Sequence, residues 1–395
     1  MYKVLFIACF LLLLWADWAL YRREVQRLSR PLRRLWLCCS VAVYLLPLVV
    51  LLTYSDATAR TMRLTIWIIW LFMLNAIPRI VYVLISRLGR LVRRPRAFGI
   101  VGAALALTIV VTMILGATVG RSRIEVRQTT IECDRLPASF DGLRVALFAD
   151  VHLGNLIHSH KQLNRLVEAI NSARPDVVVF GGDMVNLTSD EFTPAVAQIF
   201  SRVESRYGRF AVLGNHDLGL YVRDSVAHPF AENVDRILER YREAGWQPLV
   251  NQTVYIPDGV DSISLSGVSF PVEKRHMRRA ASVVPVDFEA TYAGVPDSLF
   301  NICVSHTPEL WSERIVNMPY GDLTLSGHVH SMQMKFSLLG RSWSPAKWRF
   351  GEWSGLYSRN GKYLYINDGV GYVVYPMRIG TRPEVSLIVL KSAAR

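Results

Sequence analysis

Five short apolar runs are each followed directly by polar side chains that could bind metal ions. In chain order these side chains are Asp150 and His152, then Asp183, then Asn215, His216 and Asp217, then His306, and finally His328 and His330. Imidazole nitrogens with carboxylate and amide oxygens form a ligand set suited to Mn²⁺, Fe²⁺ or Zn²⁺. The set holds too many nitrogens for Ca²⁺ or Mg²⁺, which prefer oxygen ligands. The pattern predicts a transition-metal site built from several distant segments.

Each motif alone also has an ordinary structural explanation. Asp150 could bond its own backbone in a turn, and the polar residues after Gly214 could do the same. Asp183 after two glycines could cap a helix, and His328 and His330 could be paired core histidines. The joint occurrence of five such motifs in one chain favours a shared metal site.

The number of candidate ligands bears on the reaction. The seven are Asp150, His152, Asp183, Asn215, His306, His328 and His330. One ion needs fewer, so we expect two divalent ions bridged by one carboxylate, with Mn²⁺ preferred and Fe²⁺ or Zn²⁺ as alternatives. Two such ions, about 3.5–4 Å apart, activate a bridging water and bind the oxygens of a phosphoryl group. Hydrolysis of a phosphoester is the reaction that this set predicts.

The elements that must position these residues have the texture of an α/β domain. Near-continuous apolar runs at 144–148, 177–180, 210–213, 302–304 and 323–325 predict strands buried on both faces. Further strands are expected at 262–268, 363–366 and 385–390, and helices at 162–170, 192–203 and 234–244. Ligands of open α/β sheets bind beyond the carboxyl ends of strands. All the candidate ligands follow strands in this way, so we expect them to meet at one rim.

The first third of the chain predicts a membrane domain. Apolar residues make up 51% of the sequence, and long apolar runs stand at 4–20, 35–52, 64–85 and 98–119. Each run has about the 17–25 residues that cross a bilayer as a helix. We therefore expect four transmembrane helices within residues 1–120 and a second domain at 121–395. A signal peptide is the alternative for the first run, but its arginines follow the run instead of preceding it.

The distribution of charge gives an orientation. The formal net charge is +13, yet residues 1–120 hold 15 Lys/Arg against three Asp/Glu, whereas residues 121–395 hold 30 against 29. The second domain thus lacks the basic excess of a nucleic-acid-binding domain. The arginine-rich links at 22–34 and 87–96 are expected on the cytoplasmic side. This predicts a multi-pass protein of the plasma (inner) membrane with an extracytoplasmic second domain. Arg79, inside the third run, is expected to extend to the cytoplasmic face, with a functional intramembrane site as the alternative.

The five motifs together resemble the calcineurin-like metallophosphoesterases, and within them a membrane-anchored bacterial branch. The resemblance covers residues 136–391 and implies a four-layer α/β/β/α sandwich. It implies one ion held by Asp150, His152, Asp183 and His330, and a second held by Asp183, Asn215, His306 and His328. Asp183 would bridge the two ions. The resemblance also implies that His216 is the catalytic histidine and that Asp217 orients it.

The sequence departs from the family pattern directly after the last ligand pair. Relatives commonly carry glycines and a glutamine there, whereas this chain has Ser331 and Met332 before Gln333. The tail, with Asn367-Asp368-Gly369 and a Pro-Met-Arg-Ile-Gly segment at 376–380, is similar to the branch. We expect the departure to affect the substrate pocket and not the metal ligands.

Two further features remain open at the level of sequence. The five cysteines show no metal-binding spacing, although Cys133 and Cys303 could form a disulfide in an oxidising compartment. The basic run at 274–279 and the Trp- and Arg-containing segment at 343–353 could contact phosphate-rich or lipid surfaces, with solvation or ordinary packing as the alternative.

The predicted protein is a membrane-anchored, extracytoplasmic two-metal phosphoesterase that hydrolyses phosphate ester or pyrophosphate bonds. An enzyme that acts on a soluble substrate would not need to be attached to the membrane by four spans. The four predicted spans therefore favour lipid-linked or envelope substrates. One alternative is a nucleotide-sugar-lipid pyrophosphatase on the cytoplasmic face. The other is a non-catalytic membrane scaffold on the same fold, although no ligand position is missing from the motifs.

Overall fold

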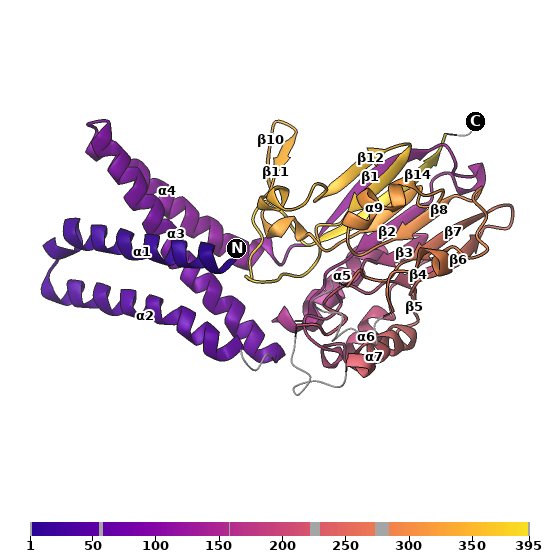
Figure 1. The fold of residues 1–395 in the computed structure, drawn as a ribbon, viewed down its shortest axis with the longest axis horizontal. Coiled ribbons are helices and arrows are strands. Elements are labelled where there is room, and N and C mark those ends of the chain that lie inside the picture. Colours follow the sequence, from indigo (N-terminus) through magenta and orange to yellow (C-terminus); the bar gives the residue numbers. More distant parts are fainter. Residues whose placement is uncertain (1, 55–57, 158, 222–229, 273–283, 394–395) are drawn as a thin grey trace. The chain divides into compact units, whose positions relative to one another are not determined.

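The computed structural model describes residues 2–54, 58–157, 159–221, 230–272 and 284–393 (Figure 1). The chain divides into two compact units, the first built mainly from residues up to 118 and the second mainly from residues 119 onward. The basic run at 274–279 lies outside the described residues.

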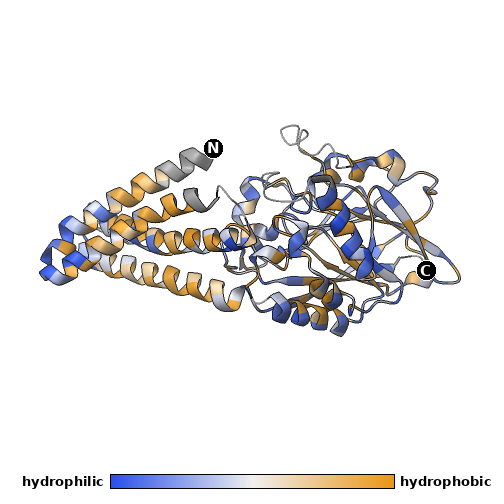
Figure 2. Ribbon diagram, turned by 90° about the horizontal axis from the view of Figure 1, so that it is seen from below, coloured by the Kyte–Doolittle hydropathy of each residue, from blue (hydrophilic) through white to orange (hydrophobic). Residues whose placement is uncertain are grey.

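The first unit consists of long helices. These are α1 (Tyr2–Arg23), α2 (Arg30–Tyr54), α3 (Ala59–Leu91) and α4 (Pro95–Leu115), with a π-helical turn at Gly116–Gly120. Among the described residues, three stretches are long and apolar enough to cross a membrane, namely Arg30–Val50, Ala59–Leu91 and Pro95–Gly120. Their apolar character is visible in Figure 2. Among the described residues the predicted count of four spans is therefore corrected to three, because α1 is not among the candidates.

Arg79 in α3 makes contacts that the sequence did not predict. Its Nη1 lies 2.9 and 3.0 Å from the two carboxylate oxygens of Asp17 in α1, and it donates to Ser40 Oγ at 3.1 Å. The Tyr44 hydroxyl donates to Asp17 at 2.8 Å. The Arg79 side chain therefore forms a largely buried ion pair and, with its bond to Ser40, joins α1, α2 and α3.

Two six-stranded sheets form the second unit. The first has the order β1 (Glu125–Cys133), β14 (Glu384–Ser392), β2 (Arg144–Phe148), β3 (Val177–Phe180), β4 (Gly208–Ala211) and β5 (Gln247–Pro248). The second has the order β12 (Gly355–Arg359), β13 (Lys362–Ile366), β9 (Leu323–Ser326), β8 (Asn301–Val304), β7 (Ser262–Gly267) and β6 (Gln252–Pro257). A separate hairpin pairs β10 (Phe336–Leu338) with β11 (Arg341–Trp343).

The main core of this unit lies between the two sheets. Leu147 and Val179 of the first sheet pack in one cluster with Leu265, Ile302 and Leu325 of the second. The outer face of the first sheet is covered by three helices, α5 (Ser159–Ser172), α6 (Pro194–Phe200) and α7 (Phe230–Glu243). The outer face of the second sheet packs against α9 (Glu309–Glu313). A further short helix, α8, spans Phe288–Thr291. The predicted mixed α/β architecture is confirmed.

Strand direction explains how distant motifs meet. The strands β2, β3 and β4 are parallel neighbours, and so are β8 and β9. Their carboxyl ends consequently lie along one edge of each sheet, where the candidate ligands follow. The bounds of β2 and β3 agree with the prediction, whereas β4 ends two residues earlier, at Ala211.

Two features of this unit differ from or complete the expectations. Strand β1 was not predicted. Most of its residues alternate between exposed and half-buried positions, so it lacks a continuous apolar run. Its parallel partner, β14, lies at the other end of the sequence. Cys133 and Cys303 are both buried and unpaired, so the disulfide that the sequence left open is not formed. Burial raises the pKa of these thiols to about 12 and about 11.

Candidate metal centre

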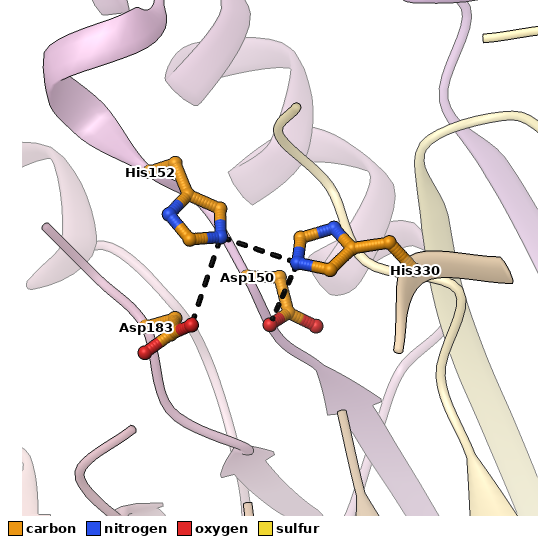
Figure 3. Close-up of side chains that lie close together, drawn as sticks. All are labelled: Asp150, His152, Asp183 and His330. Carbon is orange, nitrogen blue, oxygen red and sulfur yellow. Dashed lines mark hydrogen bonds and ion pairs between the residues drawn. The ribbon is translucent and has the colours of Figure 1, made fainter. Parts of the chain in front are cut away.

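Four predicted ligands converge beyond the ends of β2, β3 and β9 (Figure 3). His152 Nε2 lies 3.2 Å from His330 Nε2 and 3.7 Å from Asp183 Oδ2, and His330 Nε2 lies 3.2 Å from Asp150 Oδ1. All four side chains are buried. One ligand atom of each residue lies within 4.8 Å of those of the other three, an arrangement that could hold a metal ion.

A second group shares Asp183 with the first. It joins Asp183 to His306 and His328, again with ligand atoms within 4.8 Å of one another. His306 Nε2 lies 3.2 Å from Asp183 Oδ2 and 3.9 Å from Asp150 Oδ1. The imidazole rings of His306 and His328 lie 5.1 Å apart. The carboxylate of Asp183 is thus common to two clusters, as a bridging ligand would be.

Asn215 has the orientation of an oxygen ligand. Its Oδ1 is buried without a hydrogen-bond partner, whereas its Nδ2 donates to the Tyr221 hydroxyl at 2.8 Å. Buried polar atoms in folded proteins rarely lack partners. An unpartnered buried amide oxygen, one residue before the His216 N–H that contacts Asp183, is therefore the arrangement expected for a metal ligand.

The hydrogen bonds of His306 fit the same interpretation. Its Nδ1 lies 2.7 Å from the Gly181 carbonyl, so Nδ1 carries a proton and Nε2 is directed to the carboxylates. This hydrogen bond fixes a metal-binding tautomer. Burial alone would lower the pKa of His306, but the charge of Asp183 raises it to about 9. A divalent cation would compete with that proton for the same nitrogen.

The backbone at the ligands has an uncommon conformation. Asp150, His152, Asp183, His328 and His330 have φ values of 58°, 48°, 61°, 70° and 52°. Such left-handed conformations of non-glycine residues cost of order 1–3 kcal/mol each and cluster at functional sites. Packing around the site must offset this strain, so the sharp turns are maintained in order to direct these side chains.

Two glycines allow the loops to approach one another. A Cβ on Gly214 would lie 2.1 Å from Asp183 Oδ1, and a Cβ on Gly182, where φ is 99°, would lie 2.6 Å from His306 Nδ1. Any larger residue at either position would displace a candidate ligand. The glycines before Asp183 and Asn215 are therefore part of the site.

His216 stands beside the first cluster. Its ring lies 4.6 Å from that of His152, and its backbone N–H donates to Asp183 Oδ1 at 2.8 Å. Its Nδ1 lies 2.6 Å from the Asn186 carbonyl oxygen. The sequence did not indicate this contact of Asn186, because any residue type supplies a backbone carbonyl.

Asp217 corrects a predicted role. Its carboxylate accepts hydrogen bonds from the backbone N–H groups of Asp183, Val185 and Gly214 at 2.8, 3.1 and 2.9 Å. Burial and the charge of Asp183 raise its pKa to about 7. The contact to the His216 imidazole is made by Asn186 instead, so Asp217 joins the two ligand-bearing loops and does not orient His216.

A carboxylate outside the predicted set fixes the Asn186 loop. Glu191 accepts hydrogen bonds from the backbone N–H groups of Gly154, Asn186 and Leu187 at 2.9, 2.5 and 3.1 Å. It therefore stabilises the loop whose carbonyl contacts His216. Glu191 does not follow the end of a strand, so the pattern of polar residues after strands does not identify it.

The departure from the family pattern after His330 also has a structural reason. Ser331, Met332 and Gln333 have φ values of 50°, 44° and 57°, a conformation that favours glycine. Here side-chain contacts maintain the turn: the Ser331 hydroxyl donates to Asp368 Oδ1, and Gln333 Oε1 accepts from Val373 N at 2.6 Å. Lys335 Nζ lies 3.1 Å from Asp368 Oδ2.

Comparison with known proteins agrees with this site. Residues 143–332 match the family model of the calcineurin-like phosphoesterase. The uncharacterized metallophosphoesterase YkuE of Bacillus subtilis is 27% identical over 68% of this chain and 86% of its own length. A Danio rerio protein named transmembrane protein with metallophosphoesterase domain is 29% identical over 84% of this chain and 72% of its own. That match is longer than residues 121–395 alone and so includes part of the helical unit.

Residues 143–332 of the chain therefore match the calcineurin-like phosphoesterase family, and the similar proteins are named as metallophosphoesterases. These similar proteins include a bacterial one and one named as a transmembrane protein. Among solved structures, the NAD nucleotidase of Haemophilus influenzae is similar with a TM-score of 0.38 at 13% identity, over 58% of this chain and 45% of that one.

Proposed function

We propose that this protein is a two-metal phosphoesterase. In this proposal Asp150, His152, Asp183 and His330 hold one divalent ion, and Asp183, Asn215, His306 and His328 hold the other. The observation that carries the proposal is the pair of ligand clusters that share Asp183. Mn²⁺ is the ion we favour, with Fe²⁺ or Zn²⁺ as alternatives, because the ligand set mixes imidazole nitrogens with oxygens.

The chemistry follows from the residues around the clusters. Bound divalent ions would activate a water and neutralise charge on a phosphoryl group. His216, held through Nδ1 by the Asn186 carbonyl, presents its other nitrogen as a general acid for the departing oxygen. Asp217 and Glu191 position the loops that carry these groups.

The test compares metal content with turnover in the full-length protein. His216→Ala should keep both ions and lose most hydrolysis of bis(p-nitrophenyl) phosphate, because His216 contacts no cluster as a ligand. Asp183→Ala should lose ions and hydrolysis together. The matched control is His160→Ala, an exposed histidine of α5. Normal turnover in His216→Ala, or two retained ions in Asp183→Ala, would contradict the assignment.

Removal of metal provides an independent check. Treatment with a chelator should abolish hydrolysis, and Mn²⁺ added back should restore more activity than Zn²⁺ or Mg²⁺. Best recovery with Mg²⁺ would show that the ligand chemistry has been misread. A wild-type protein with fewer than two ions and no hydrolysis of an activated ester would favour the non-catalytic scaffold.

We further propose that residues 121–395 form an extracytoplasmic catalytic domain, and residues 1–120 its anchor in the plasma membrane. The orientation rests on the arginine-rich links at 22–34 and 87–96. It does not depend on α1, because α2 begins and α3 ends beside these links whether or not α1 spans the membrane.

A cysteine-free variant with single cysteines added at Asn360 and Leu91 tests this topology. A membrane-impermeant thiol reagent on intact cells should label the exposed Asn360 position and not the exposed Leu91 position, which ends α3. The reverse pattern would place the catalytic domain inside and restore the cytoplasmic pyrophosphatase. For the substrate we propose phosphorylated, lipid-linked molecules, because the enzyme is confined to the membrane.

A further inference from the structure

The β10–β11 hairpin exposes an unusual amount of apolar surface. Leu338 is 76% exposed and Leu339 94%, and Phe336 and Trp343 are 50% and 39% exposed. Trp348, which follows the hairpin, is 80% exposed. Single exposed apolar residues are common, but a contiguous group of this kind marks an interaction site.

The tip of the hairpin carries Leu339, a residue type that does not stabilise this kind of turn. Leu339 and Gly340 connect the two strands with φ values of 50° and 76°. Asn, Asp or Gly usually occupy both positions of such a turn, because they tolerate positive φ. Leucine at the first position is strained and has almost no contacts of its own. A residue that costs local stability without packing points to a partner outside the chain.

The apolar surface is ordered before it meets that partner. Phe336 packs on Trp343 with ring centroids 5.9 Å apart, and Trp343 packs edge-on against Trp348 at 5.4 Å. The hydroxyls of Ser337 and Ser342 lie 2.8 Å apart across the strands. The side chains are thus held in place, so binding would not have to order them.

Charge on the same segment selects the kind of partner. Between Ser331 and Gly351 there are four basic residues and no acidic one. Arg341 in β11 and Lys347 beside Trp348 are exposed. Basic residues that flank exposed tryptophan and leucine match the interface of an anionic bilayer, where aromatic rings lie at headgroup level and aliphatic tips reach the acyl chains.

We propose that the β10–β11 hairpin, with Trp348, inserts into the interface of the bilayer that holds the membrane helices. The partner is anionic phospholipid. Leu338 and Leu339 enter the acyl region, Trp343 and Trp348 lie at the headgroups, and Arg341 and Lys347 contact lipid phosphates. Only residues 121–124 separate the helical unit from β1, so the unit that carries the hairpin is tethered to the membrane helices by a short link.

The hairpin is connected directly to the candidate metal centre. Ser344, just after β11, donates from Oγ to the Ser331 carbonyl at 2.6 Å, next to the candidate ligand His330. Gln333 and Ile379 are joined by a backbone hydrogen bond of 2.9 Å. Insertion would therefore hold the His330 loop near lipid phosphates. This last consequence rests on the proposed function, whereas insertion itself does not.

Photocrosslinking in nanodiscs tests the insertion. The full chain, with p-benzoylphenylalanine in place of Leu339, is placed in discs of phosphatidylethanolamine and phosphatidylglycerol at a ratio of about 3:1. The matched control carries the same probe in place of Val260, which is apolar and 83% exposed in the β6–β7 connection. We expect at least tenfold more lipid adduct at 339 than at 260, and severalfold less when phosphatidylcholine replaces phosphatidylglycerol.

Several outcomes would overturn the proposal. These are equal lipid adduct at 339 and 260, adducts at 339 to a second copy of the chain or to the scaffold protein, and a yield that ignores lipid charge. Because a bulky probe could disturb the turn, the experiment is repeated with the probe in place of Trp348, and circular dichroism verifies that each variant is folded. Lipid crosslinking does not require hydrolysis, so its failure is separable from failure of the phosphoesterase assignment.

Discussion

The hydroxyl of Tyr221 should control the metal affinity of this protein through Asn215. It accepts the hydrogen bond that Asn215 Nδ2 donates at 2.8 Å, while Asn215 Oδ1 has no hydrogen-bond partner. Tyr221→Phe removes this acceptor but keeps the ring that packs on His216 at 4.4 Å. A hydrogen bond of this kind contributes about 1 kcal/mol, and loss of such a support lowers metal affinity about tenfold or more in known sites. We expect the ion that Asn215 would help to hold, together with Asp183, His306 and His328, to lose affinity about five- to tenfold.

Titration of the purified full-length protein with Mn²⁺, followed by electron paramagnetic resonance, measures this affinity. Hydrolysis of bis(p-nitrophenyl) phosphate at increasing Mn²⁺ gives a second readout, in which Tyr221→Phe should need more metal and approach wild-type turnover at saturation. Tyr255→Phe is the matched control, because its hydroxyl also makes one hydrogen bond, to the Gly294 carbonyl at 3.3 Å, and its side chain is similarly exposed. Wild-type affinity in Tyr221→Phe, or an equal loss in Tyr255→Phe, would refute the reasoning.

Three further predictions concern positioning, the helical unit and pH. Glu191→Gln should lower turnover about tenfold and leave the metal content unchanged, because the amide offers one acceptor oxygen to three backbone N–H groups. A loss of metal that parallels the loss of activity would argue against a role of Glu191 in positioning the loop. Asp17→Asn and Arg79→Met should each lower the free energy of unfolding in detergent by about 3–5 kcal/mol. The double variant should lose less than the sum of the two, since it leaves no unpaired buried charge. Additive losses in thermal unfolding would contradict the ion pair. Burial and the charge of Asp368 raise the pKa of Glu384, so the folded protein keeps a proton that the unfolded chain releases. Stability should fall as the pH rises above about 4.3 towards that raised pKa, and Glu384→Gln should flatten this slope.

The convergence of the candidate ligands could be anticipated because it depends on strand order along one rim. Asp150 and Asp183 follow runs that read as buried strands, and those strands are parallel neighbours in the structure. The spacing of apolar residues and their hydrophobicity are local properties, so the sequence alone predicts these strands. The same reasoning could not supply the hydrogen bonds around His216, because the Asn186 carbonyl has no signature in residue type.

Hydropathy likewise could not predict the polar contacts between the helices of the first unit. The apolar runs predicted where the helices lie, and the structure supports three of the four as membrane spans. Whether Arg79 extends to an interface or pairs with Asp17 depends on how α1 and α3 pack, which no single run contains.

The sequence by itself determined the resemblance to the calcineurin-like phosphoesterases, the mixed α/β class, the apolar helices and the residues available as metal ligands, since each is encoded in residue type and local spacing. Only the tertiary structure decided that Asp217 joins two loops instead of orienting His216, that Cys133 and Cys303 stay apart, and that Ser331 and Met332 adopt a turn that glycine usually forms. These outcomes depend on which backbone groups approach one another when the two sheets pack. That proximity is a property of the folded chain, because contacts across 30 to 200 residues leave no periodic trace in the sequence.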